Sequence, residues 1–165
     1  MKVAIVYYSM SKNTEFAAQE IAVATDADLI PIEPVKAYPS KGMRKFIWGG
    51  KSAVMKEEPE LMPYVFDADK YDAVVIGCPV WASSPAPPIR TFIKENLKAL
   101  SQKRLAAFVC CGGGGAAKAF SKMRAALDNA PLVSELILID PKDKPTPDKI
   151  RQIRDFAETI TKEPK

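Results

Sequence analysis

The chain alternates short apolar runs, many of them β-branched, with longer stretches of helical periodicity. The runs suit strands buried on both faces, and the stretches between them repeat apolar residues at the spacing of a helix. The predicted strands cover residues 3–8, 28–33, 73–78, 105–110 and 133–139. The predicted helices cover residues 13–24, 87–100, 116–127 and 147 to about 160, and Thr146 is the expected N-cap of the last of them. This alternation predicts an α/β fold, a three-layer α-β-α sandwich around a five-stranded parallel sheet.

The length of 165 residues suits one domain, and we expect residues 1–165 to form it. Neither an internal repeat nor a domain linker interrupts the chain. The stretch from Pro34 to Asp69 is long and irregular, and Met43 to Met55 within it could form a helix. From Lys36 to Lys56 it contains six Lys or Arg and no acid. We interpret residues 34–69 as an elaborated basic connection after the second strand.

The chain contains no histidine, which excludes the Ser-His and Cys-His nucleophile pairs. It also excludes metal and haem sites with histidine ligands, and we expect neither catalytic residues nor a metal site. The formal charge of +4 is too modest to indicate a nucleic-acid-binding protein. Any reaction centre must therefore come from other side chains, from the backbone or from a cofactor.

The three cysteines Cys78, Cys110 and Cys111 cannot all pair within the chain, and two of them are adjacent. This usage favours a reducing compartment, so we expect a cytoplasmic protein. The apolar runs are too short for a membrane span, and the N-terminal run reads as a first strand rather than a signal peptide. We therefore expect no membrane insertion.

Parallel sheets of this kind bind ligands at the carboxyl ends of the strands, where the strand order reverses. For the expected order 2-1-3-4-5, this crevice lies between strands one and three. The loops after strands one, three and four therefore meet at the predicted binding site.

The loop after strand one is rich in hydroxyl and amide side chains and leads straight into a helix. Its residues are Ser9, Met10, Ser11, Lys12, Asn13 and Thr14. The start of a helix offers unpaired N–H groups and the positive end of the helix dipole, which together bind phosphate. Ser11 or Asn13 could instead merely cap the helix, but capping explains one such residue and not four.

The loop after strand three, residues 79–88, places Trp81 between prolines. Trp81 could form a flat apolar wall for a ring ligand or simply pack against a neighbouring loop. The loop after strand four contains four consecutive glycines, Gly112 to Gly115. They allow positive φ and a close approach of backbone to a ligand, although a flexible turn is the alternative. One phosphate loop and two ring-binding loops together indicate a mononucleotide.

Other proteins of this architecture fit less well. The first loop has neither the G-x-G-x-x-G pattern of a dinucleotide-binding domain nor a Walker A sequence. A receiver domain would need acidic residues after strand one, where this chain has Ser9. A low-molecular-weight phosphatase would need a cysteine in the same loop.

The segment from Val3 to Thr14 resembles the first strand and phosphate loop of the flavodoxin family. Residues 77–88 look like the first flavin-contacting loop of flavodoxin-like proteins from anaerobic bacteria. The Cys-Cys-Gly turn at 110–115 is similar to their second flavin loop, and the basic insertion around Lys41 to Pro59 is similar as well. The resemblance covers essentially the whole chain.

This resemblance implies a non-covalently bound FMN. The phosphate would be bound by Ser9, Ser11, Asn13 and Thr14 and by the backbone of Met10 and Lys12. The isoalloxazine ring would lie between residues Pro79, Val80, Trp81, Ala82 and Ser83 on one side and Cys111, Gly112, Gly113, Gly114 and Gly115 on the other. Trp81 is the expected stacking residue.

The chain also departs from the family in three respects. Lys12 stands where the phosphate loop commonly has glycine, and Ala82 and Ser83 stand where electron carriers often have a glycine. Typical flavodoxins are acidic, whereas this chain is basic.

The function that the resemblance implies is electron transport between redox partner proteins. The alternative is an FMN-dependent oxidoreductase that uses NAD(P)H with a quinone-type acceptor, and a third reading is an interaction domain without cofactor. Cys110 and Cys111 could form a redox dithiol, but their adjacency favours structural packing. The basic stretch Lys36 to Lys56 could contact an acidic partner or a nicotinamide nucleotide, or it could be a solvated surface.

Overall fold

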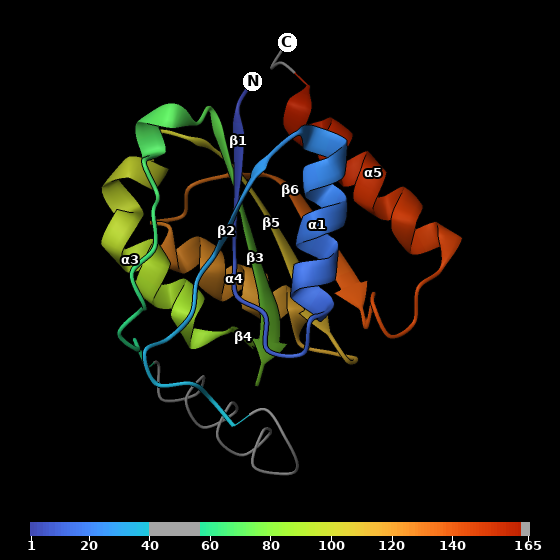
Figure 1. The fold of residues 1–165 in the computed structure, drawn as a ribbon, viewed down its shortest axis with the longest axis horizontal. Coiled ribbons are helices and arrows are strands. Elements are labelled where there is room, and N and C mark those ends of the chain that lie inside the picture. Colours follow the sequence, from blue (N-terminus) through green and yellow to red (C-terminus); the bar gives the residue numbers. More distant parts are fainter. Residues whose placement is uncertain (40–56, 163–165) are drawn as a thin grey trace.

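A computed structural model describes residues 1–39 and 57–162 (Figure 1). Its main sheet contains the strands β1 (Val3–Tyr7), β2 (Asp28–Pro31), β3 (Ala73–Trp81), β5 (Arg104–Cys111) and β6 (Leu132–Ile139). The spatial order is β2-β1-β3-β5-β6, and all neighbours in it are parallel. This is the order predicted from the sequence, so the fold class is confirmed. The short strand β4 (Ser84–Pro85) pairs antiparallel with the end of β3.

Helices cover both faces of the sheet (Figure 1). They are α1 (Asn13–Thr25), α3 (Pro87–Leu100), α4 (Ala116–Ala126) and α5 (Pro147–Thr161), with a 3-10 turn η1 (Ala68–Lys70) before β3. α1 and α5 share one core with alternate strand residues such as Ile5 and Phe108. α3 and α4 share the other core with residues such as Val6 and Ile76. All five residues of β1 are buried, because helices cover both faces of this central strand.

A close approach between β3 and β5 fixes the middle of the sheet. Gly77 lies opposite Phe108 in the ladder, and a Cβ added to Gly77 would lie 2.2 Å from the Phe108 Cζ. The Phe108 ring is fully buried and occupies the space that a side chain at position 77 would need. Glycine is therefore required here by packing.

The structure differs from the sequence expectation at the end of β3. β3 does not end at Cys78 but continues to Trp81, so three of the residues expected in the second loop lie in a strand. Pro79 pairs with Cys110 on β5, and Val80 and Trp81 pair with β4, which together extend the strand. The possible helix Met43–Met55 lies outside the described residues. The predicted cap of the last helix is confirmed, since the Lys149 N–H donates to the Thr146 Oγ1 over 3.3 Å.

The connection after β2 is anchored on both sides of its undescribed part. The N–H of Val35 donates to the Glu60 carbonyl over 2.8 Å, and the N–H of Met62 donates to the Glu33 carbonyl over 2.7 Å.

Within residues 1–39 and 57–162, none of the helices is long and apolar enough to cross a membrane.

Candidate functional site at the carboxyl edge of the sheet

The first loop makes a sharp turn between β1 and α1. Lys12 is the residue before the helix and has a left-handed backbone, with φ of 67° and ψ of 3°. A non-glycine residue pays about 1–2 kcal/mol for this conformation. The loop thus adopts a left-handed backbone at the position where the family commonly has glycine.

The hydroxyl of Ser9 supports the start of α1. The Ser9 Oγ accepts the N–H of Glu15 over 3.1 Å, and the Lys12 carbonyl accepts the N–H of Phe16 over 3.1 Å. Among the described residues, the N–H groups of Asn13 and Thr14 have no acceptor. These two donors lie at the positive end of the helix dipole, where an anion is stabilised.

The side chain of Asn13 binds another loop of the protein. Its Nδ2 donates to the Asp143 Oδ2 over 2.8 Å, and its Oδ1 accepts the N–H of Lys142 over 2.9 Å. The sequence had indicated this amide as a phosphate ligand. In the structure it connects α1 to the loop after β6, and its backbone N–H is the part that remains for a ligand.

Lys12 brings a positive charge to the first loop. Its Nζ lies 2.5 Å from the Glu15 Oε2, and its side chain is largely exposed. The hydrogen bond to Glu15 and its charge raise the pKa of Lys12. Because its pKa is raised, the ammonium group of Lys12 stays charged at neutral pH. Burial also raises the pKa of the neighbouring carboxyl group of Glu33.

The second loop is the tight turn of a β-hairpin. Ala82 and Ser83 connect β3 to β4 and both have positive φ, 47° and 56°. Two-residue hairpin turns of this kind favour Asn-Gly, so alanine and serine are strained here. The Ser84 hydroxyl that follows is buried and accepts the Lys122 Nζ over 2.5 Å. This hydrogen bond joins Lys122 on α4 to the hairpin.

The third loop meets the second at Gly115. This glycine has φ of 90° and precedes α4. A Cβ on Gly115 would lie 2.7 Å from the Ser83 Oγ and 3.0 Å from the Ser83 Cα. Gly113 and Gly114 differ, because an added Cβ would meet no atom within 4 Å in the described structure. Their backbone borders open space in the described structure.

Trp81 lies in an aromatic cluster, which we define as Tyr8, Tyr38 and Trp81. The Trp81 ring meets Tyr8 at a centroid distance of 5.8 Å and Tyr38 at 5.1 Å, both edge to face. Trp81 is only 9% exposed. The sequence indicated Trp81 but not its two neighbours. Tyr8 could have been found because it directly precedes the first loop, whereas nothing in the sequence marks Tyr38.

The cysteines next to the site are buried thiols. All three are free, and burial raises the pKa of Cys78 and that of Cys110 to about 12. The Thr14 hydroxyl hydrogen-bonds to Cys110 and lowers its pKa, but burial is the larger effect. The thiol of Cys111 donates to the Gly113 carbonyl over 3.7 Å. The environments of Cys78 and Cys110 suit packing and not a reactive thiolate.

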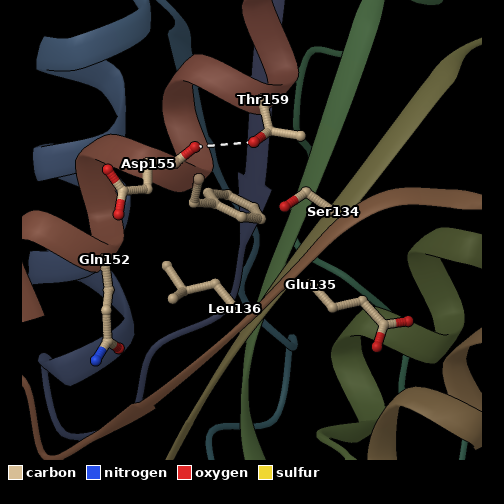
Figure 2. Close-up of a pocket in the computed structure, with 7 residues that line it drawn as sticks. Ser134, Glu135, Leu136, Gln152, Asp155 and Thr159 are labelled. Atoms are coloured by element: carbon tan, nitrogen blue, oxygen red, sulfur yellow. Dashed lines mark hydrogen bonds between the residues drawn. The ribbon is translucent and has the colours of Figure 1, made fainter.

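The predicted loops therefore come together. Tyr8 at the start of the first loop touches Trp81 in the second, and Ser83 touches Gly115 in the third. A separate open cavity of about 250 Å³ lies between β6 and α5 (Figure 2). It is lined by residues such as Leu136, Asp155 and Phe156, and it includes none of the residues expected at the binding site.

Comparison with known proteins gives a consistent picture. A family model described as Flavodoxin matches residues 2–150. A flavoprotein from Lactobacillus acidophilus NCFM, solved in complex with FMN, is 23% identical with a TM-score of 0.73, covering 86% of this chain and 95% of that one. A flavoprotein from Bacteroides eggerthii is 21% identical with a TM-score of 0.77, covering 98% and 99%.

A more distant structure is the two-electron reduced flavodoxin of Megasphaera elsdenii. It is 17% identical, with a TM-score of 0.58, and the match covers 96% of this chain and 97% of that one. At these identities the likeness shows the fold. Among curated proteins, no match was found.

Proposed function

The chain belongs to the flavodoxin family, and from this premise we propose that it binds FMN non-covalently and carries electrons between redox partner proteins. The observation that carries the proposal is the convergence of the loops after β1, β3 and β5 on one edge of the sheet. Ser83 against Gly115 and Tyr8 against Trp81 make this convergence a matter of direct contact. Such an edge is where open parallel sheets bind nucleotides.

The phosphate end of the site is formed by the first loop. The N–H groups of Asn13 and Thr14 lack an acceptor within the described residues, and the left-handed turn at Lys12 precedes them. We expect these donors and the hydroxyl of Ser11 to hold the phosphate, with the Lys12 ammonium adding charge. Two side-chain hydrogen bonds keep the turn in place. The Ser9 hydroxyl accepts the N–H of Glu15, and the Asn13 amide donates to Asp143 in the loop after β6.

The ring end of the site is formed by the hairpin and the glycine loop. Gly113 and Gly114 border open space, so a planar ring can approach their backbone closely. We expect Trp81 to form the aromatic side of the site, next to the strained turn Ala82–Ser83. These features would suit the isoalloxazine ring of FMN.

The bound FMN supplies the redox centre, and the protein orients it and shields it from water. The side chains around the site fit a protein that leaves the redox reaction to the cofactor. The chain has no histidine, and the thiol pKa values of Cys78 and Cys110 are about 12, so neither cysteine supplies a reactive thiolate at neutral pH. The protein's part is to bind, orient and exclude water.

The net positive charge of the chain comes from one stretch of the sequence. Residues 40–56 hold five of the 24 Lys and Arg and none of the 20 Asp and Glu. The positive charge of this stretch is larger than the formal charge of +4 of the whole chain. The remaining sequence is therefore close to neutral, and the basic total does not argue against a flavodoxin body.

The direct test is titration of the purified protein with FMN and with riboflavin. We expect a shifted flavin spectrum, quenched flavin fluorescence and binding of FMN about 100-fold tighter than riboflavin, because a phosphate held by several charge-assisted hydrogen bonds adds about 3 kcal/mol. Val23→Ser, on the exposed side of α1, is the matched control and should bind like the wild type. Absence of a flavin spectrum would overturn the proposal.

The carrier role is tested separately by mixing the FMN-loaded protein with NADH or NADPH and a quinone. A carrier should show no turnover with these substrates alone, but should accept electrons from a flavin-dependent reductase. Steady NAD(P)H oxidation without a second protein would instead identify the reductase alternative.

A further inference from the structure

We propose that Tyr38 is a positioning residue of the cofactor site, which sets the orientation of the Trp81 ring and links the connection after β2 to that ring. The inference rests on the proposed function, because it assigns Trp81 to the wall of the FMN site. It adds a residue from a segment that neither the loop pattern nor the family resemblance places there.

The contact geometry singles out Tyr38. Its ring centroid lies 5.1 Å from that of Trp81 at an interplanar angle of 85°, closer than Tyr8 at 5.8 Å and 87°. Tyr8 and Tyr38 also meet each other, at 6.5 Å and 69°. Edge-to-face contacts at these separations are the attractive arrangement of aromatic rings. Two such neighbours leave the Trp81 indole little freedom to rotate.

Tyr38 is itself held by the anchored part of the connection. The backbone pairing of Val35 with Glu60 and of Met62 with Glu33 fixes the chain shortly before it. The strand of chain at 59–62 is tied in turn to α3, because the Thr91 hydroxyl donates to the Pro59 carbonyl over 2.9 Å. A continuous set of contacts therefore runs from α3 through this pairing toward Tyr38 and Trp81.

This arrangement has a consequence for ligand binding. A ring that is already fixed loses less conformational entropy when a planar ligand stacks on it, so fixing Trp81 raises affinity without adding a contact to the ligand. Removing the Tyr38 ring should free Trp81 and weaken stacking, while loss of the Tyr38 hydroxyl alone should leave the ring contact intact. The two effects separate the ring from the hydroxyl.

The experiment compares Tyr38→Ala, Tyr38→Phe and Tyr64→Ala as full chains. Tyr64 is a control on the same connection, since its ring contacts Phe92 at 5.8 Å, on α3 rather than at Trp81. FMN affinity is measured by fluorescence quenching. Trp81 motion is measured by fluorescence anisotropy in a Trp48→Phe background, where Trp81 is the only tryptophan left in the sequence.

We expect Tyr38→Ala to weaken FMN binding about three- to tenfold and to lower the Trp81 anisotropy before FMN is added. Tyr38→Phe keeps the ring and should therefore stay closer to the wild type than Tyr38→Ala in both readouts, and Tyr64→Ala should keep wild-type affinity even if it is less stable. Should Tyr38→Ala fail to fold, Tyr38→Leu replaces it, because leucine fills part of the volume without a ring.

Wild-type anisotropy and affinity in the ring-deleting variant would overturn the role of Tyr38 while leaving FMN binding intact. An equal loss in Tyr64→Ala would also overturn it, because the effect would then be general destabilisation. A wild-type protein that binds no FMN would instead overturn the proposed function. The two failures are therefore distinguishable.

Discussion

Gly115 lies so close to Ser83 that any side chain at position 115 would collide with the hairpin turn. An added Cβ would lie 2.7 Å from the Ser83 Oγ and 3.0 Å from the Ser83 Cα. Rotation of the Ser83 side chain can relieve the first contact, but the second is with backbone, which would have to shift. This contact joins the turn after β3 to the start of α4.

Gly115→Ala should lower both stability and FMN affinity. The variant adds the collision with Ser83 to the cost of a left-handed alanine at φ of 90°, together about 2–4 kcal/mol. The free energy of unfolding is measured in urea and FMN affinity by titration. Gly113→Ala is the matched control for stability, because its Cβ meets open space. We expect Gly113→Ala to keep wild-type stability yet bind FMN more weakly, and full affinity in it would contradict the placement of the ring over the glycine loop.

Gly77→Ala should destabilise the protein without touching the site directly. Its Cβ would lie 2.2 Å from the buried Phe108 ring, and overpacking of this kind costs about 1–3 kcal/mol or more. Urea unfolding is the measurement. The double variant Gly77→Ala with Phe108→Leu should recover part of the loss, since leucine vacates part of the space. No recovery would argue that the ring is not the cause.

Lys12→Gly should raise stability and lower FMN affinity at low salt. Glycine tolerates φ of 67°, which favours the variant by about 1 kcal/mol, but the ammonium group and its pair with Glu15 are lost. Asp26→Gly at the end of α1 also relieves a left-handed residue, at φ of 53°, and serves as the control. FMN titrations at two salt concentrations separate the two variants. Equal affinities for both would show that Lys12 does not act on the phosphate.

Asn13→Ala should loosen the loop after β6. Both ends of the amide would be lost, leaving the N–H of Lys142 and the carboxylate of Asp143 without their partner, at a cost of about 1–3 kcal/mol. Asn13→Asp should cost more, because it places a second carboxylate beside Asp143. The readout is urea unfolding together with amide hydrogen exchange at residues 140–144. Unchanged exchange there would contradict the role assigned to Asn13.

The stability of the protein should fall as the pH rises from about 9 to about 12. Burial raises the pKa of the Cys78 and Cys110 thiols from the ordinary 9.0 to about 12. The unfolded chain therefore loses these protons first and is favoured increasingly over this range. Below pH 9 both states hold the protons and the effect vanishes. Urea unfolding of Cys78→Ala and Cys110→Ala across this range should give a shallower dependence than the wild type.

Much of the fold was predictable because its pattern is local. The alternation of apolar runs with helical periodicity predicted the strands and their parallel order, and the Thr146 cap was confirmed at its atom. The end of β3 was not, because Val80 and Trp81 lie in a strand end that depends on pairing with Pro85 and Ser84. A hairpin of this length leaves too weak a sequence signal, and its turn has Ala82 and Ser83 where glycine is usual.

The sequence by itself determined the architecture, the three loops at the sheet edge and the family. Hydrophobic periodicity and loop composition are properties of residues that are close together in the chain, so both can be recognised without the structure. Tertiary structure alone decided which atoms face a ligand. It turned the Asn13 amide toward the loop after β6, set Gly115 against Ser83 and brought Tyr38 onto Trp81. Each of these contacts joins residues far apart in the chain, and only packing in three dimensions selects such partners.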